Sequence, residues 1–388
     1  MILKLEPQTL ANEFSQLGIH PASEAIFLHK SEIVPLKILD IRTPAANIIK
    51  QEMLACGGDC AIPAGCVVCA EERVDVILLG TYKHYARLLE KLTQMPYFGM
   101  AGIKSELMAI LDAPIPQTIL SDGRTLNYDK MLVMGILNIT PDSFYAGSRV
   151  PQLEQVVEKA GEMLRQGAAV LDIGGESTRP GSDAVTADEE QKRIVPVIKA
   201  LKERYPACVI SIDTYRASTA EAALAAGADI INDVTAMEGD AAMSDLVVGS
   251  KVPIILMHMR GTPKNMQQNC EYKNVVTEVA AYLLQRAKIL ENRGVAKEKI
   301  IFDPGIGFAK NIEQNLQLMQ GLKSLTGLGY PVLLAASRKS TIGSVLGGIP
   351  AEERQAVYAG AQMVRVHDVQ ENLRAIRMLE AILCPSHI

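Results

Sequence analysis

The sequence lacks the features that mark membrane, secreted and nucleic-acid-binding proteins. No apolar run reaches the roughly 18 residues that a membrane span needs, and residues 1–7 lack the basic-then-apolar pattern of a secretory signal. The 39 Lys and Arg residues are outnumbered by 44 Asp and Glu, which gives a formal net charge of -5. Nucleic acid would require a clustered excess of cations. We therefore expect a cytoplasmic protein that binds small molecules and neither nucleic acid nor a membrane.

The seven cysteines do not form the even, regularly spaced set that indicates a disulfide framework. Four of them, Cys56, Cys60, Cys66 and Cys69, occur as C-x3-C-x5-C-x2-C, a spacing that matches no common zinc motif well. A metal or cluster site is one interpretation, and a group of buried free thiols is the other. The second is favoured, because the neighbouring residues are small or apolar and a free cysteine packs as a small hydrophobe.

The chain is long enough for two or three domains at about 150 residues each. Residues 113–116, Ala-Pro-Ile-Pro, form the clearest linker signal. Residues 1–112 then predict a small α/β domain of unknown role, and residues 117–388 a second domain. The first domain shows apolar runs at 25–28, 34–41 and 74–79 in alternation with helical patterns at 45–54 and 84–92.

The second domain begins with a predicted β-hairpin and continues as repeated strand–helix units. Residues 118–128 form the hairpin, with its turn at Asp122-Gly123. Eight apolar strand candidates, each followed by a helical pattern, start near Met131, Ala169, Val209, Asp229, Pro253, Ile300, Val332 and Met363. This number in about 260 residues predicts an α/β fold of the (β/α)8 TIM-barrel type. An open doubly wound sheet is the alternative, but residues 135–147 contain no G-x-G-x-x-G.

Polar side chains stand at the predicted carboxyl end of every strand. They are Asn138, Asp172, Asp213, Asn232 with Asp233, His258, Asp303, Ser337 to Lys339, and Arg365 with His367. In a barrel these ends converge on one mouth, so we expect a pocket there. Carboxylates and amides suit a heterocycle with several N–H donors, whereas Arg179, Arg365 and His367 suit phosphate oxygens.

Eight segments resemble, in order, the successive motifs of the dihydropteroate synthase family. They are MGILNITPDSF (134–144), DIGGESTRPG (172–181), SIDTYRA (211–217), INDV (231–234), LMHMRGTP (256–263), FDPGIGF (302–308), SRKS (337–340) and RVHDV (365–369). The resemblance covers roughly residues 117–384. It implies a pterin-binding transferase of folate biosynthesis, which condenses 6-hydroxymethyl-7,8-dihydropterin diphosphate with 4-aminobenzoate and releases pyrophosphate.

The resemblance also implies roles for individual residues. The pterin ring would be bound by Asp213, Asn232, Asp303, Lys339 and Met257. The diphosphate would be held by Thr178, Arg179, Arg365 and His367, and Val366 is a further expected substrate-binding residue. The benzoate would lie between Pro180 and Phe308, with its carboxylate near Ser340 and Phe144 closing over it. Of these, the expected catalytic residues are Lys339, Asp213, Arg365 and His367.

Further expectations from the resemblance concern a metal, mobile loops and assembly. Asn138 would bind Mg2+ together with the diphosphate, since this hard cation takes few protein ligands and keeps its waters. Residues 140–151 and 177–188 would be lids that close over the substrates. The family forms homodimers, and we expect one here.

Several residues also have a purely structural interpretation, and the chain departs from the family pattern in places. Asp172 and Asp233 can serve as caps or loop braces, and His258 as a core histidine. Between Ser340 and Arg365 the seventh outer helix is shorter by roughly ten residues than a barrel helix requires, which puts the family's dimer packing in doubt. Ala309 replaces a usual glycine, and residues 335–336 are Ala-Ala where Gly-Thr is usual.

Two other functions remain open at this point. One is a pterin-binding methyltransferase that moves a methyl group from a tetrahydrofolate to a corrinoid; it would share the pterin-binding acids but would not need Arg179, Arg365 and His367. The other is a non-catalytic, pterin-binding regulatory paralogue, which the shortened helix suggests.

Overall fold

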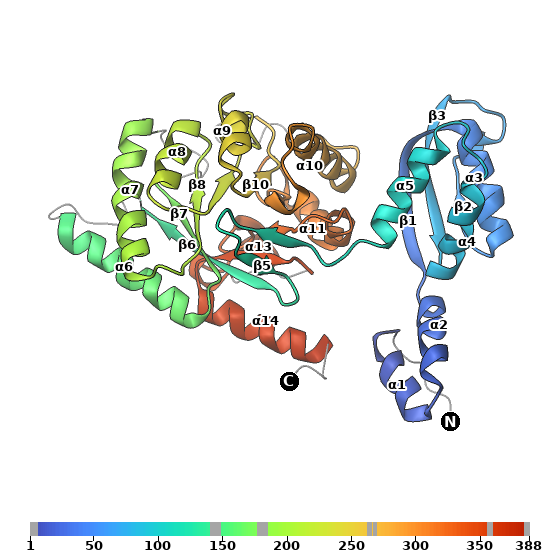
Figure 1. The fold of residues 1–388 in the computed structure, drawn as a ribbon, viewed down its shortest axis with the longest axis horizontal. Helices are drawn as coiled ribbons and strands as arrows, with labels where there is room; N and C mark the ends of the chain where they lie inside the picture. The colour runs from blue at the N-terminus through green and yellow to red at the C-terminus, as the bar shows by residue number, and fades with distance from the viewer. Residues whose placement is uncertain are drawn as a thin grey trace. The chain divides into compact units, whose positions relative to one another are not determined.

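The computed structural model describes residues 7–139, 149–176, 185–261, 266, 270–354 and 360–383. It divides into two units, Met1–Ala113 and Pro114–Ile388, and Figure 1 traces both. Within the described ranges, no helix has the length and apolar character that crossing a bilayer requires.

The first unit contains a three-stranded antiparallel sheet. β3 (Arg73–Gly80) lies between β1 (Val34–Arg42) and β2 (Asp59–Ala61), and α3 (Thr43–Cys56) connects the two outer strands. This is the split βαβ arrangement. Residues of β3 alternate between exposed and buried, so helices cover only one face of the sheet. The remaining helices are α1 (Leu10–Leu17), α2 (Pro21–Ser31), α4 (Tyr82–Leu92) and α5 (Met100–Leu111).

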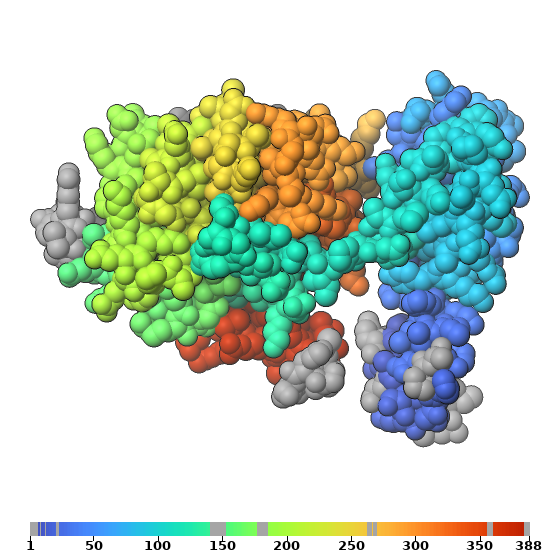
Figure 2. Space-filling view, in the orientation of Figure 1, coloured from blue at the N-terminus to red at the C-terminus, as the bar shows by residue number. Residues whose placement is uncertain are grey.

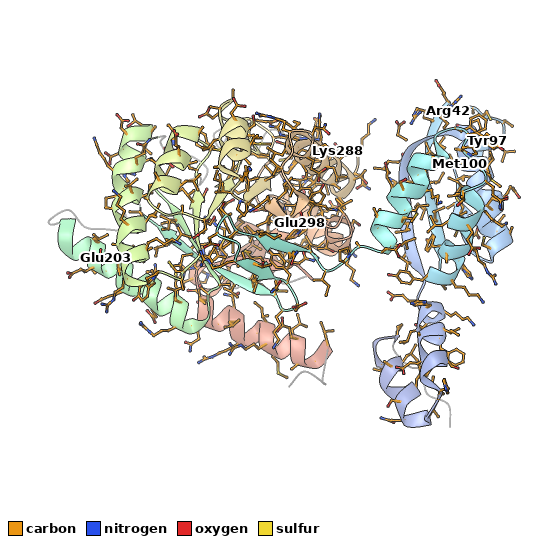
Figure 3. The ribbon with its side chains drawn as sticks, viewed as in Figure 1. Arg42, Tyr97, Met100, Glu203, Lys288 and Glu298 are labelled. Atoms are coloured by element: carbon orange, nitrogen blue, oxygen red, sulfur yellow. The ribbon has the colours of Figure 1, made fainter. Side chains whose placement is uncertain are left out.

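One expected strand of this unit is wrong. The apolar run at 25–28 lies inside α2, because a run of four apolar residues fits a helix as well as a strand, and Pro21 at its first position favours a helix start. At the other end of the unit, Arg42 lies over the ring of Phe98 at 5.2 Å. Tyr97 and Met100 are beside it at the start of α5 (Figure 3).

The cysteine segment lies in the core of this unit. Cys56, Cys60 and Cys66 are buried, and Cys69 is exposed. Burial raises the pKa of the Cys60 thiol to about 11, which disfavours the thiolate that a metal site requires. The described residues include no group of three or more His, Cys, Asp or Glu arranged to hold a metal ion.

The second unit is a parallel eight-stranded barrel, which confirms the predicted fold class. The strands follow the order β11-β10-β9-β8-β7-β6-β13-β12, and a parallel bridge between Phe302 and Val332 joins the two ends. Each strand begins within one residue of its expected position. The strands are β6 (Leu132–Asn138), β7 (Val170–Gly174), β8 (Ile210–Asp213), β9 (Ile230–Asp233), β10 (Ile254–Met257), β11 (Ile300–Asp303), β12 (Leu333–Leu334) and β13 (Met363–Val366).

Helices cover the outside of the barrel, and in the space-filling view α7 to α10 form a continuous outer layer (Figure 2). In the described residues the seventh is short, as expected: α13 (Ser340–Val345) is followed there by one 3-10 turn at Ala351–Glu353, and residues 355–359 lie outside the described ranges. The others are α6 (Arg149–Gln166), α7 (Ala187–Arg204), α8 (Ala217–Ala225), α9 (Met243–Ser250), α10 (Val275–Glu291), α11 (Ile312–Gln320), α12 (Leu322–Thr326) and α14 (Val369–Leu383).

The lower half of the barrel interior is apolar and is closed by a hairpin. Each strand, or the residue just before it, contributes one buried side chain to this layer: Met134, Val170, Val209, Ile230, Ile255, Ile301, Leu333 and Met363. The hairpin of β4 (Gln117–Ile119) and β5 (Thr125–Asn127) packs Leu120, Leu126 and Tyr128 against it. Gly123 adopts φ 88° in the turn, a conformation that favours glycine. Polar groups can therefore enter only from the opposite end.

We expect Leu120→Ala to lower the free energy of unfolding by about 2 to 4 kcal/mol, because it leaves a cavity under the barrel floor. Leu120 is 2% exposed, whereas Ile115, the matched control, is 64% exposed. Ile115→Ala should change the free energy by less than about 0.5 kcal/mol. Urea unfolding of both variants measures the difference, and equal effects would contradict the plugging role of the hairpin.

Candidate active site

Above the apolar layer, the barrel interior becomes polar. Side chains of a strand alternate between its two faces, so residues two positions beyond the apolar layer also point inward. On the described strands these are Ile136, Asp172, Ser211, Asn232, Met257, Asp303 and Arg365. Two residues further along the chain, at or just after the carboxyl ends of their strands, come Asn138, Asp213 and His367. The sequence had placed the charged residues, the amides and His367 at one mouth, and the structure brings them together. Met257 was expected there through the resemblance alone, and Ser211 and Ile136 were not expected.

Arg365 is the centre of this layer. Its Nε donates to Asp172 Oδ2 at 2.5 Å, and a terminal nitrogen donates to Asp213 Oδ2 at 2.6 Å. Asn232 Nδ2 donates to both oxygens of Asp172, to Oδ2 at 3.2 Å and to Oδ1 at 3.4 Å. Asp172 is fully buried and Asp213 is 8% exposed. Asp172 therefore acts as a brace that orients Arg365 and Asn232.

Burial controls the protonation of this cluster. It raises the pKa of Asp213 above the ordinary carboxyl range; Arg365 opposes the shift and Asp172 adds to it. The two carboxylates raise the pKa of Arg365, which keeps the guanidinium charged. A buried cation between two carboxylates is stable only while all three groups stay paired.

Asp303 and Lys339 form the second charged part of the site. Asp303 Oδ1 accepts a hydrogen bond from Gly305 N at 2.7 Å, and burial raises the pKa of its carboxyl group, with Lys339 opposing. Lys339 Nζ donates to Ile306 O and lies 4.8 Å from the centre of the Phe308 ring. Burial lowers the pKa of Lys339 to about 8. The lysine thus lies between Asp303 and Phe308, two residues expected to contact different substrates.

The ends of β12 and β13 are tied together by side chains. Ser337 Oγ lies 3.2 Å from His367 Nδ1, and Arg338 donates to Asp368 at 2.8 Å. Ser340 is exposed at the start of α13. Val366 differs from its expected role: its side chain lies in the core between sheet and helices, because the alternation that points Arg365 inward points its neighbour outward.

The other two residues with a structural interpretation, Asp233 and His258, also have structural roles. Asp233 accepts hydrogen bonds from the backbone N–H groups of Thr235 and Met237, so it braces its own loop. His258 is 2% exposed, and its Nδ1 lies 3.0 Å from Lys310 Nζ, within hydrogen-bond distance. Burial lowers the pKa of His258 to about 2, which makes it a neutral core histidine.

Four expected site residues lie outside the described residues: Phe144, Thr178, Arg179 and Pro180. The expected lids at 140–151 and 177–188 lie mostly outside them as well. Arg216 contacts the described residues on both sides of 177–184, since it donates to Glu176 and to Val185 O. It also pairs with the buried Glu190 at 2.7 Å. Arg216 was not among the expected site residues, because the spacing of residues along the chain does not show which segments its side chain joins.

The expected metal ligand, Asn138, lies beside the acidic side of the site. A Cβ placed on Gly174 would be 3.7 Å from Asn138 Oδ1 and 3.8 Å from Asp213 Oδ2, so the glycine leaves room between these two oxygens. Hard oxygen donors at a spacious position suit Mg2+, which takes one or two protein ligands and otherwise binds water and phosphate. The residues present therefore fit the ion.

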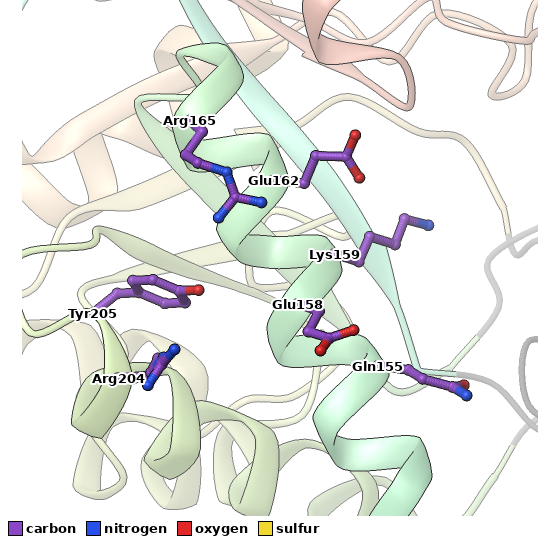
Figure 4. Close-up of a pocket in the computed structure, with 7 residues that line it drawn as sticks. All are labelled: Gln155, Glu158, Lys159, Glu162, Arg165, Arg204 and Tyr205. Atoms are coloured by element: carbon purple, nitrogen blue, oxygen red, sulfur yellow. The ribbon is translucent and has the colours of Figure 1, made fainter.

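A separate surface cavity of about 530 Å3 lies between α6 and α7 (Figure 4). Its lining is charged and includes Lys159, Arg165, Arg204 and Tyr205. Arg165 and Arg204 stand at the carboxyl ends of helices that run against the strand direction. This places the cavity at the barrel end opposite the polar layer, so it is no part of the site.

Comparisons with known proteins point to one family. Residues 134–367 match the family described as "Pterin binding enzyme". The dihydropteroate synthase of Bacillus subtilis is 43% identical over 277 residues, which are 69% of this chain and 94% of that protein. The structure of Xanthomonas albilineans dihydropteroate synthase with 4-aminobenzoic acid is 39% identical with a TM-score of 0.63, covering 69% of this chain and 98% of that one.

A third relative extends beyond the barrel. The probable bifunctional folylpolyglutamate synthase/dihydropteroate synthase of Haloferax volcanii is 36% identical over 361 residues, or 88% of this chain. The match therefore reaches into the first unit. The chain spans 42% of that relative's length.

Arg365→Met should destabilise the protein by about 3 to 5 kcal/mol at pH 8, because it leaves buried carboxylates unpaired. The loss should be smaller at pH 5.5. Without the cation, the pKa of Asp213 rises further above its unfolded value, so stability is lost as the pH increases through that range. Urea unfolding at both pH values tests this, with the exposed Arg374→Met as control. A pH-independent loss would contradict the ionic role.

Proposed function

The chain belongs to the dihydropteroate synthase family of pterin-binding enzymes, and we propose that it condenses 6-hydroxymethyl-7,8-dihydropterin diphosphate with 4-aminobenzoate in folate biosynthesis. The products are 7,8-dihydropteroate and pyrophosphate. The observation that carries this proposal is the polar layer at the strand ends, in which acids, an amide and cations converge above an apolar barrel floor. The first unit has no assigned part in this reaction.

The acids and the amide suit the pterin. Asp213, Asn232 and Asp303 offer oxygens to the N–H groups of the ring, and such pairing offsets the cost of burying these polar groups. Met257 supplies an apolar contact for the ring face, and Lys339 a donor for the ring carbonyl. A ring held by carboxylates also tolerates positive charge on the methylene carbon as its bond to the diphosphate breaks.

The cations suit the departing pyrophosphate. Arg365 and His367 follow each other on the inward face of β13, and Thr178 and Arg179 are their expected partners. In this structure Arg365 donates hydrogen bonds to Asp172 and Asp213. A diphosphate entering the site competes with these carboxylates for the guanidinium, which frees Asp213 to accept from the pterin.

The aryl amine needs orientation more than activation. Its amino group is neutral near pH 7, so it attacks the methylene carbon without a dedicated base. Phe308, with Pro180, would flank the benzoate ring. Ser340 and the positive charge of Lys339 would receive its carboxylate.

We propose Mg2+ as the cofactor, with Asn138 as its protein ligand and the diphosphate oxygens as the others. When bound, the ion neutralises charge that develops on the leaving pyrophosphate. We further propose a cytoplasmic homodimer. Apolar side chains exposed near the shortened seventh helix, Val345 and Leu346, are available for such an interface, and sedimentation analysis of the full chain tests it.

Pyrophosphate release from the two substrates and Mg2+ tests the proposed reaction. Lys339→Ala should lower kcat by at least about 100-fold, because it removes a preorganised cation from the reacting centre. The exposed Lys323→Ala, the control, should leave the rate unchanged. Release by the unsubstituted protein no faster than by Lys339→Ala would refute the reaction. Calorimetric binding of the pterin without turnover would instead support a non-catalytic pterin-binding protein.

Asn138→Ala should raise the Mg2+ concentration that gives half-maximal rate by about tenfold, since one ligand of the ion is lost. The rate at saturating Mg2+ should change less. Titration of the rate with Mg2+ after treatment with a chelator measures both quantities. An unchanged Mg2+ dependence would show that Asn138 is not the ligand.

A further inference from the structure

Lys310 is a buried lysine whose described hydrogen-bond partners include no carboxylate. It is 2% exposed. Its Nζ lies 2.9 Å from Phe308 O, 3.1 Å from Gly305 O and 3.0 Å from His258 Nδ1, with a longer contact of 3.4 Å to His258 O. Burying an ammonium group is costly unless its three donors are satisfied, and here they are satisfied by two carbonyls and an imidazole. The proposed reaction gives this group no part.

His258 is fixed as the acceptor of this arrangement. Its Nδ1 faces the ammonium group, so the ring proton is on Nε2. The ring packs edge-on against Tyr282 at 4.9 Å. Because the pKa of His258 is lowered to about 2, the imidazole stays neutral in the physiological range and can accept from Lys310.

The atoms that Lys310 binds lie on the two segments that follow the neighbouring strands β10 and β11. Gly305 and Phe308 are the ends of the turn that follows Asp303 in β11, and His258 follows Met257 in β10. Ala309, next to Phe308, adopts φ 52°, a strained conformation for a residue with a side chain. The Phe308 ring packs in a cluster with Val234, Met257, Met259, Met266 and Ala309.

We propose that Lys310 is a positioning residue: its ammonium group holds the Gly305–Phe308 turn to the end of β10, and so places the Phe308 ring where it contacts the aryl amine substrate. This inference rests on the proposed function for the identity of the substrate. The placement of the ring by Lys310 does not depend on it. Without the ammonium group, two carbonyls lose their donor and the turn is free to leave the strained geometry at Ala309.

The hold depends on the charge of Lys310. Burial lowers its pKa to about 7; Asp303 opposes this shift, whereas Lys339 and Arg260 add to it. Cys270 also acts on Lys310 and raises the pKa of the lysine. As the pH rises through this value, the amine loses one of its three donors. The turn is therefore held most firmly on the acidic side of neutrality.

A tryptophan probe tests the placement directly. The chain has no tryptophan, so Phe308→Trp introduces a single fluorophore at the ring in question. In this background we expect the emission maximum to shift with an apparent pKa near that of Lys310. Adding Lys310→Met should abolish the titration and leave the emission at its high-pH position. An unchanged titration in the double variant would overturn the proposal.

Lys202 provides the matched control. Its Nζ donates to Cys208 O and to Asp229, each at 2.7 Å, at the opposite end of the barrel. Lys202→Met in the Phe308→Trp background removes a comparably bonded lysine and should preserve the titration. Loss of the titration in this variant as well would show a general loosening of the fold, and would also overturn the proposal.

Kinetics separate positioning from structural support. In the chain with Phe308 retained, Lys310→Met should raise KM for 4-aminobenzoate about tenfold, the equivalent of one charged hydrogen bond. KM for the pterin diphosphate should change by less than about twofold, within the scatter of remote substitutions. Equal increases of both would contradict a role through Phe308. If the unsubstituted chain does not catalyse the condensation, the proposed function fails, and the fluorescence experiment still decides the role of Lys310.

Discussion

The bridge that Arg365 makes between Asp172 and Asp213 is the interaction on which the site depends. A guanidinium and two carboxylates can share a barrel interior only if nearly every donor and acceptor is used. The apolar layer and the hairpin below exclude water from one side. Asn232 donates to both carboxylate oxygens of Asp172, whereas the buried Ser211 Oγ has no hydrogen-bond partner among the described residues. The charged groups are thus positioned before any substrate arrives, and a diphosphate would exchange hydrogen bonds with them without having to assemble them.

Much of this arrangement is readable from the sequence because barrels are regular. Each buried parallel strand is a short apolar run, and its polar end must face the mouth; Asp213 and Asp303 were found in this way. The rule does not tell which of two neighbouring residues on a strand points inward. Val366 belongs to the same motif as Arg365, yet its side chain points into the outer core. Lys310 could not be found, since a lysine after a glycine-rich turn usually faces solvent, and only the folded chain shows which carbonyls enclose it.

The shortened seventh helix changes the outer layer and leaves the polar layer in place. The ends of β12 and β13 are joined by the contacts of Ser337 with His367 and of Arg338 with Asp368. Arg354 secures the segment after α13, since its guanidinium donates to Ile349 O at 2.7 Å and lies against Gly343. These side-chain hydrogen bonds hold the strand ends and the segment after α13 in place, as a longer helix would do by packing against the barrel.

The barrel ring has one weak seam. Seven neighbouring strand pairs of the described barrel share regular ladders, whereas β11 and β12 meet through the bridge of Phe302 with Val332. The turn with Phe308 follows one side of this seam and Lys339 follows the other. Thermal opening of the ring there would displace Asp303, which ends β11, and Lys339, which follows β12. It would therefore loosen the contacts expected for the pterin together with the slot for the aryl amine, along a line that both substrates share.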